Sequence, residues 1–173
     1  LLMRFPAMAY WNQRTVAKRV TATGIGLHSG HPVTLTLAPA PADAGVTFVR
    51  MDLGVEIPAR NENVLDTTLS TTVGVGKARV STVEHVMAAL HGMGIDNCRV
   101  EVDGPEMPIL DGSAAPFVVM IKEAGVQLLL PAEGRTTKPS LRLNAAESRW
   151  KSGVAVTRFG LGLSRCRFFE MTN

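Results

Sequence analysis

The stretch 81-STVEHVMAALHGMG-94 decides the fold, because the apolar residues of the chain take up helical spacing there. Its apolar side chains recur three or four residues apart and fall on one helical face: Val83, Val86, Met87, Leu90 and Met93. Gly94 follows the last of them, a position typical of a helix C-terminus. The pattern predicts a helix over residues 82–93 with one buried face.

On both sides of this helix the chain alternates in short apolar bursts bounded by Gly and Pro, which predicts strands. In 31-HPVTLTLAP-39, the side chains of Val33, Leu35 and Leu37 would face a core. Further strands are expected over VAKRVTATG (16–24), AGVTFVRMD (44–52), TTLSTTVG (67–74), KARVS (77–81) and NCRVEVDG (97–104).

A second helix is predicted over residues 113–124, with Ser113 suited to cap its N-terminus. Its apolar face would contain Phe117, Met120, Ile121 and Ala124. Helices with one apolar face each, combined with alternating strands, predict an α+β fold. We expect a two-layer sandwich in which an antiparallel-rich sheet carries both helices on one face.

Residues 13–130 are therefore expected to form one domain, and both ends of the chain differ from it. Residues 1–12 lack the basic start and cleavage site of a secretory signal, so we interpret them as a disordered leader. Residues 131–173 have no sustained period and contain six arginines but no Asp or His. We expect a divergent, poorly ordered tail there.

The net charge of +3 comes mainly from that tail. Residues 1–130 hold 10 Lys+Arg and 12 Asp+Glu, whereas residues 131–173 hold 8 and 3. No basic patch with interleaved aromatic residues accompanies this charge, so we expect no nucleic-acid partner. No run approaches the roughly 18 uninterrupted apolar residues of a membrane span. With two cysteines and no export signal, the protein is expected to be cytoplasmic and free of disulfides.

Glu84 and His85 permit a structural and a chemical interpretation. Residues 81–84 match a capping box, in which the Glu84 carboxylate accepts a hydrogen bond from the Ser81 amide, and the pattern alone favours this interpretation. His85 lies on the helix side opposite the apolar stripe. Its neighbours on that side are small: Ser81, Ala88, Ala89 and Gly92. Small residues let a second structure approach closely, so we expect His85 at a seam.

The sequence contains neither a complete H-E-x-x-H zinc motif nor a complete dinucleotide-binding fingerprint. One helical turn from His85 stand Ser81 and Ala89, so this helix offers no H-E-x-x-H zinc motif. The stretch 24-GIGLHSG-30 resembles a dinucleotide fingerprint, but its third glycine is one place late and a strand follows it. A tight hairpin with His28 at its exposed tip is the better interpretation.

Taken in order, several segments resemble one family, the zinc-dependent UDP-3-O-acyl-N-acetylglucosamine deacetylases of lipid A biosynthesis. They are QRTVAKRVTATGIGLHSGHPVTLTLAPAPADAGVTFVR (13–50), LDTTLSTTV (65–73), VSTVEHVMAALHGMGIDN (80–97) and VDGPEMPILDGSAAPF (102–117). The resemblance implies a ribosomal protein S5 domain 2-like fold that faces a second, similar domain across the active site. It also implies zinc as cofactor and UDP-3-O-acyl-N-acetylglucosamine as substrate, with acetate released by amide hydrolysis.

The resemblance also implies roles for individual residues. His85 matches a zinc ligand, Glu84 matches the general base that activates the zinc-bound water, and Leu69 and Ser70 match positions lining the substrate site. The family's other two ligands, a histidine and an aspartate of the second domain, have no counterpart, because no His follows His91 and no Asp follows Asp111. The missing second deacetylase domain is therefore an expected partner. The alternative is a non-catalytic fragment, or a binding or assembly module, that keeps the fold without a complete metal site.

Overall fold

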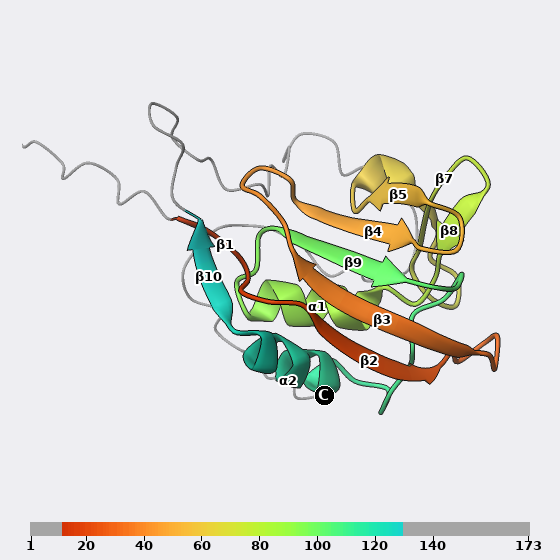
Figure 1. Cartoon of the computed structure of the whole chain (residues 1–173). Coiled ribbons are helices and arrows are strands. Elements are labelled where there is room, and N and C mark those ends of the chain that lie inside the picture. The colour runs from red at the N-terminus through yellow and green to blue at the C-terminus, as the bar shows by residue number, and fades with distance from the viewer. Residues whose placement is uncertain (1–11, 130–173) are drawn as a thin grey trace, which may run out of the picture. The chain divides into compact units, whose positions relative to one another are not determined.

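A five-stranded sheet lies at the centre of residues 12–129, the part of the chain that the computed structural model describes (Figure 1). Its strand order is β2-β3-β9-β4-β5. The strands are β2 (Val20–Ile25), β3 (Pro32–Pro39), β4 (Val46–Arg50), β5 (Val55–Pro58) and β9 (Cys98–Val102). Within the described residues, all neighbours in this sheet are antiparallel except β4 and β9, which run parallel. The antiparallel-rich sheet is thus confirmed.

Strand β9 lies between β3 and β4 and takes its register from both. Its Val100 is the partner of Leu37 on β3 and of Phe48 on β4, and all three side chains are fully buried. Because successive strand residues point to opposite faces, Arg99 and Glu101 lie on the other face of the sheet. One face of β9 is therefore apolar and the other charged.

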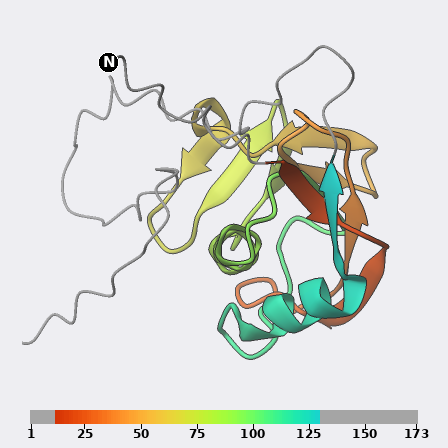
Figure 2. The ribbon, with the colours of Figure 1, turned by 90° about the vertical axis from the view of Figure 1, so that its left-hand side faces the viewer.

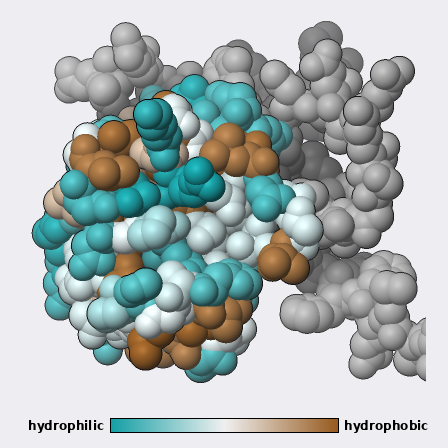
Figure 3. Space-filling model, turned by 90° about the vertical axis from the view of Figure 1, so that its right-hand side faces the viewer, coloured by the Kyte–Doolittle hydropathy of each residue, from teal (hydrophilic) through white to brown (hydrophobic). Residues whose placement is uncertain are grey.

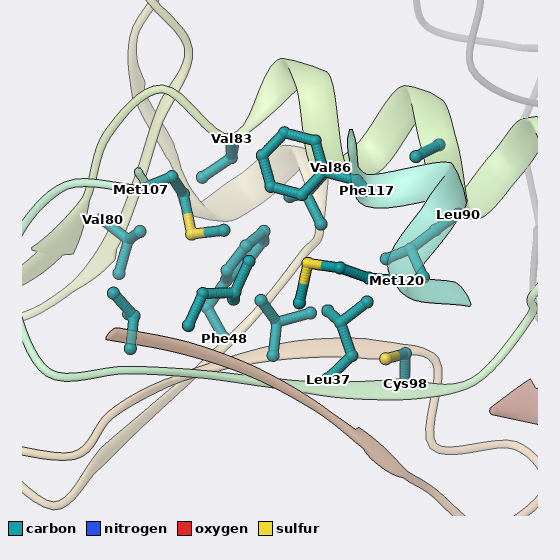
Figure 4. Packing of buried hydrophobic residues seen from close by; sticks show 14 of the residues in the cluster. Leu37, Phe48, Val80, Val83, Val86, Leu90, Cys98, Met107, Phe117 and Met120 are labelled. Carbon is teal, nitrogen blue, oxygen red and sulfur yellow. The ribbon is translucent and has the colours of Figure 1, made fainter. Parts of the chain in front are cut away.

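Both helices, α1 (Glu84–Gly92) and α2 (Ala115–Ala124), cover the apolar face of this sheet, as two views show (Figure 1, Figure 2). Their buried side chains meet those of the sheet in one core (Figure 4), to which the following residues belong: Leu37, Phe48, Val86, Leu90, Cys98, Phe117 and Met120. Burial of such side chains is the main favourable term in folding. The predicted two-layer α+β sandwich, with both helices on one face, is confirmed.

The ends of the helices follow local chemistry. Helix α1 begins two residues later than predicted, because Thr82 has a left-handed backbone with φ 59°. Helix α2 also begins two residues later than predicted, at Ala115, and its N-cap is Ala114, which makes no side-chain capping hydrogen bond. The prediction of Ser113 as N-cap is therefore wrong, although Ser113 Oγ accepts a 3.1 Å hydrogen bond from the Ala115 amide. Gly125 follows α2 with φ 73°, a backbone conformation that residues other than glycine rarely adopt.

Smaller sheets accompany the central one within residues 12–129. Strands β6 (Val64–Asp66), β7 (Thr72–Val75) and β8 (Ala78–Val80) form an antiparallel sheet after the 3-10 turn η1 (Asn61–Asn63). Strand β1 (Gln13–Val16) pairs in antiparallel fashion with β10 (Val126–Leu129).

Two strand predictions are wrong in their extent. Residues 67–74 are not one strand, because the Asp66 carboxylate accepts hydrogen bonds from the Thr68 amide (3.0 Å) and hydroxyl (2.7 Å) and turns the chain between β6 and β7. Residues 16–24 are likewise divided by a bend between β1 and β2. In both stretches the β-branched composition concealed the turn.

The chain divides into two units, Leu1–Ser140 and Leu141–Asn173, and all described residues belong to the first. The predicted tail, residues 131–173, and all but Asn12 of the predicted leader, residues 1–12, lie outside the described residues. Both expectations therefore stay predictions. Over residues 12–129, no helix has the length and apolar character that crossing a membrane requires.

The packing of α2 on the sheet yields a direct test. Phe117 is 1% exposed, whereas Val119 on the same helix is 54% exposed. We expect Phe117→Ala to lower the free energy of unfolding by about 3–5 kcal/mol, because it leaves a cavity in the core. Val119→Ala should change it by less than about 0.5 kcal/mol. Urea denaturation of both variants checks this, and equal effects would contradict the packing described.

Candidate active site

A pocket lies where the tip of the β2–β3 hairpin, the β6–β7 loop and the segment before α1 meet. Its volume is about 340 Å³, and its lining residues are His28, Asp66, Thr68, Leu69, Ser70 and Ser81. The two predicted substrate-site residues, Leu69 and Ser70, therefore lie in one pocket wall. Leu69 is 83% exposed, so its side chain is open to any molecule that enters.

Glu84 connects this pocket to α1. Its Oε2 accepts a 3.0 Å hydrogen bond from the Thr71 amide, and the Thr71 carbonyl accepts one of 3.3 Å from the Val83 amide. Two hydrogen bonds of Thr71, one through its amide and one through its carbonyl, thus hold the loop that carries Leu69 and Ser70 against the start of α1. The capping-box interpretation is wrong, because the Ser81 amide donates to the Pro105 carbonyl instead.

The second Glu84 oxygen and the His85 imidazole remain available for other partners. Among residues 12–129, neither Glu84 Oε1 nor the His85 ring makes a hydrogen bond, and both residues are only half-buried. Glu84 and His85 are not themselves among the residues lining the pocket. They lie next to it in the chain, three and four residues after Ser81.

The small-residue face proposed around His85 is partly wrong. Ala88 and Gly92 are exposed, as that interpretation requires. Ala89, however, is 1% exposed and belongs to the core with Val86 and Leu90. The apolar stripe of α1 is therefore wider than the sequence period indicated, and the open face next to His85 is narrower.

The surface around this end of the sheet is mixed in polarity. Figure 3 views the side on which the β2–β3 hairpin ends and on which β7 and β8 lie, and it shows hydrophobic patches separated by hydrophilic residues. Large hydrophobic side chains are exposed on the segments that form the pocket, namely Leu27, Leu65 and Leu69. Such a mixture suits a ligand with both polar and apolar parts.

Glu106 does not line the pocket but is hydrogen-bonded to segments beside it, and the sequence did not reveal this role. It is 4% exposed, and its Oε1 accepts hydrogen bonds from the His28 amide (2.9 Å) and the Thr82 hydroxyl (3.3 Å). Its Oε2 accepts one of 2.8 Å from the Ser29 amide. Burial alone would raise the pKa of Glu106, but the hydrogen bonds from His28, Ser29 and Thr82 outweigh it and hold the pKa below its ordinary value.

His28 and Asp66 were also missed as pocket residues. Both lie in segments that resemble the family, yet the sequence placed His28 at an exposed hairpin tip and Asp66 just before a predicted strand. His28 is indeed exposed at that tip. Only the folded chain shows that this tip and the turn after Asp66 meet in one pocket.

A complete metal site is absent from the described part of the chain. No group of three or more His, Cys, Asp or Glu side chains within residues 12–129 could hold a metal ion together. A catalytic zinc site takes three protein ligands and keeps one position open. His85 can therefore provide at most one ligand of a larger set.

Comparison with known proteins shows which family this chain matches. Residues 13–152 match the family LpxC, UDP-3-O-acyl N-acetylglycosamine deacetylase. Proteins named UDP-3-O-acyl-N-acetylglucosamine deacetylase are 80% identical over 122 residues in Anaeromyxobacter dehalogenans, 78% over 120 in another Anaeromyxobacter and 61% over 119 in Myxococcus xanthus.

These matches cover 70%, 69% and 68% of this chain but only 40%, 40% and 38% of the relatives. The chain thus spans about 40% of the length of the curated relatives that it matches. The site described above lies wholly inside the matched segment.

The lowered pKa of Glu106 predicts a dependence of stability on pH. A carboxyl group whose pKa is lower in the folded chain stabilises the fold above its ordinary value of 4.5, and this contribution is lost as pH falls through the folded pKa. We therefore expect the free energy of unfolding to fall less steeply with acid in Glu106→Gln than in the wild type. Urea denaturation between neutral pH and acid below 4.5 measures both slopes.

Glu62 offers a matched control, because its side chain is 66% exposed and its ion pair with Arg60 joins two exposed groups. Such pairs contribute little to stability. Glu62→Gln should leave the acid slope close to that of the wild type. An unchanged slope in Glu106→Gln would contradict the hydrogen-bonded carboxylate.

Proposed function

This chain belongs to the UDP-3-O-acyl N-acetylglycosamine deacetylase family, and on that premise we propose that residues 13–130 form the first domain of a zinc-dependent deacetylase. The proposed reaction, in the cytoplasm, is hydrolysis of the N-acetyl group of UDP-3-O-acyl-N-acetylglucosamine during lipid A biosynthesis, with release of acetate. One observation carries the proposal: Glu84 and His85 open α1 beside the pocket wall of Leu69 and Ser70, and within residues 12–129 neither Glu84 Oε1 nor the His85 imidazole makes a hydrogen bond.

His85 fits one ligand position of the proposed zinc, since the residue is half-buried and its ring makes no hydrogen bond within the described residues. The remaining ligands are proposed to come from a second domain, because the described chain holds no complete ligand group. When bound, zinc would polarise the acetyl carbonyl and lower the pKa of its bound water.

Glu84 is proposed as the general base. Its Oε2 is fixed by the Thr71 amide, which orients the carboxylate and leaves Oε1 to accept a proton from the attacking water. Water oxygen adds to the acetyl carbon, the carbon–nitrogen bond then breaks, and the nitrogen leaves as an amine after taking up a proton. The products are acetate and the free glucosamine amine, so atoms balance without a further reactant.

Leu69 and Ser70 are proposed to contact the substrate. Leu69 presents an exposed apolar side chain, and Ser70 beside it adds a hydroxyl group that can donate or accept. Substrate binding would remove Leu69 from water, which is favourable in proportion to the apolar area covered. The non-catalytic alternative receives no comparable support, since the named relatives are deacetylases.

Replacement of the general base provides the test of this proposal. In an enzyme that combines this segment with the second domain, Glu84→Gln should reduce kcat roughly a hundredfold to ten-thousandfold. It should still bind zinc, because His85 is kept. Acetate release and metal content are measured together. Glu123→Gln on the exposed side of α2 serves as the control and should retain activity. Loss of zinc with Glu84→Gln would show that Glu84 is a ligand instead.

The ligand count leads to a second prediction. A polypeptide of these 173 residues alone should bind zinc weakly and release no acetate, because one imidazole cannot hold the ion in an open catalytic geometry. Metal analysis after dialysis and an acetate assay check both points, and addition of the second domain should increase both signals. Stoichiometric zinc in the isolated polypeptide would contradict the proposed division of ligands.

A further inference from the structure

Glu106 joins segments that meet at the pocket but are distant in sequence. Its two oxygens accept hydrogen bonds from the consecutive amides of His28 and Ser29 at the hairpin tip. The same side chain accepts one from the hydroxyl of Thr82, two residues before Glu84. A single side chain is thus bonded to the loop that carries His28 and to the entry into α1.

This carboxylate is buried without a cation. Among residues 12–129, Glu106 takes part in no salt bridge, although it is 4% exposed. Glu101, which is 7% exposed on the opposite face of the sheet, is paired with Arg19 and Arg99. A buried charge is unfavourable unless hydrogen bonds or a counter-charge compensate it. Glu106 is compensated by donors from the pocket segments themselves.

The surroundings of Glu106 are tightly built. A side chain on Gly26, in the same hairpin, would collide with Ser29 Oγ and Glu106 Oε2. Thr82 is 2% exposed and has φ 59°, a conformation that a β-branched residue rarely adopts. Such a conformation persists only where its neighbours hold it, and the hydroxyl bond to Glu106 is one of those contacts.

We propose that Glu106 is a positioning residue, which fixes the spacing between His28 on one side of the pocket and Glu84 and His85 on the other. The inference rests on the proposed function only where it concerns catalysis. The positional part concerns the folded chain itself. The proposed role gives Glu106 no contact with substrate or metal, because it acts through the backbone at His28 and through Thr82.

The first experiment compares Glu106→Gln with Glu101→Gln in the 173-residue chain by nuclear magnetic resonance. Both variants remove a buried carboxylate, but a glutamine at 106 presents an NH₂ group to a backbone amide that needs an acceptor. We expect hydrogen exchange at the His28 and Ser29 amides to accelerate roughly tenfold or more in Glu106→Gln alone. Proton–proton contacts between residues 27–29 and 81–82 should weaken with it.

Gly26→Ala is the second variant, because it keeps the charge of Glu106 and displaces its carboxylate by collision. It should weaken the same contacts, and it keeps the test decisive if Glu106→Gln does not fold. If hydrogen exchange and proton–proton contacts stay unchanged in both Gly26→Ala and Glu106→Gln, the proposal is overturned. Equal changes in Glu101→Gln would also overturn it, since the effect would then reflect general destabilisation.

The second experiment measures catalysis in the enzyme that combines this segment with the second domain. Glu106→Gln should lower kcat roughly tenfold to a hundredfold with little change in KM, because misplaced groups reduce turnover more than binding. Glu101→Gln should leave kcat unchanged. If Glu84→Gln keeps full activity in the same enzyme, the proposed function fails, and the resonance data still decide the positional role. An active Glu84-dependent enzyme with normal kcat in Glu106→Gln would overturn the positioning.

Discussion

The left-handed turn at Thr82 is the constraint on which the arrangement of this domain depends. It lets the chain leave β8 and enter α1 within a few residues, with Val86 and Leu90 directed to the core and Glu84 and His85 left half-buried. For a residue other than glycine, this conformation costs about 1–2 kcal/mol. Backbone hydrogen bonds on both sides of the turn help to hold it: Ser81 before it donates to Pro105 and accepts from Met107, and Val83 after it donates to Thr71. In a regular capping box, the Glu84 carboxylate would accept from the Ser81 amide in place of the Thr71 amide, and the helix would start earlier.

The sequence predicted those parts of the fold that follow from periodicity alone. The alternation in β3 identified Val33, Leu35 and Leu37 as core residues, and the helical spacing identified the buried faces of α1 and α2. The periods also implied that both helices share one face of the sheet, because each has a single apolar side. These features depend on the regular spacing of apolar side chains along the chain, so no single residue determines them.

The sequence-based predictions are wrong where a single hydrogen bond determines the local structure against the preference of the residue composition. Residues 67–74 are rich in β-branched residues, and the Asp66 carboxylate still turns the chain at Thr68. The motif at Glu84 suited a cap, but the Thr71 amide comes from a distant loop and takes its place as donor. Glu106 was inconspicuous in sequence because its partners lie far from it in the chain. In the candidate site, a family resemblance identified residues from the sequence, and the structure added the contacts that hold them.

The pairing of β1 with β10 has a consequence for the order in which the domain forms. It joins residues 13–16 to residues 126–129, so all described residues except Asn12 lie within the loop that this pairing closes. Closure of so long a loop carries a large entropic penalty, and pairings of high sequence separation form slowly. The β2–β3 hairpin and the α1 turn need only nearby residues. Of the described strands, β1 is synthesised first and β10 last, so we expect their pairing to form last and to separate first.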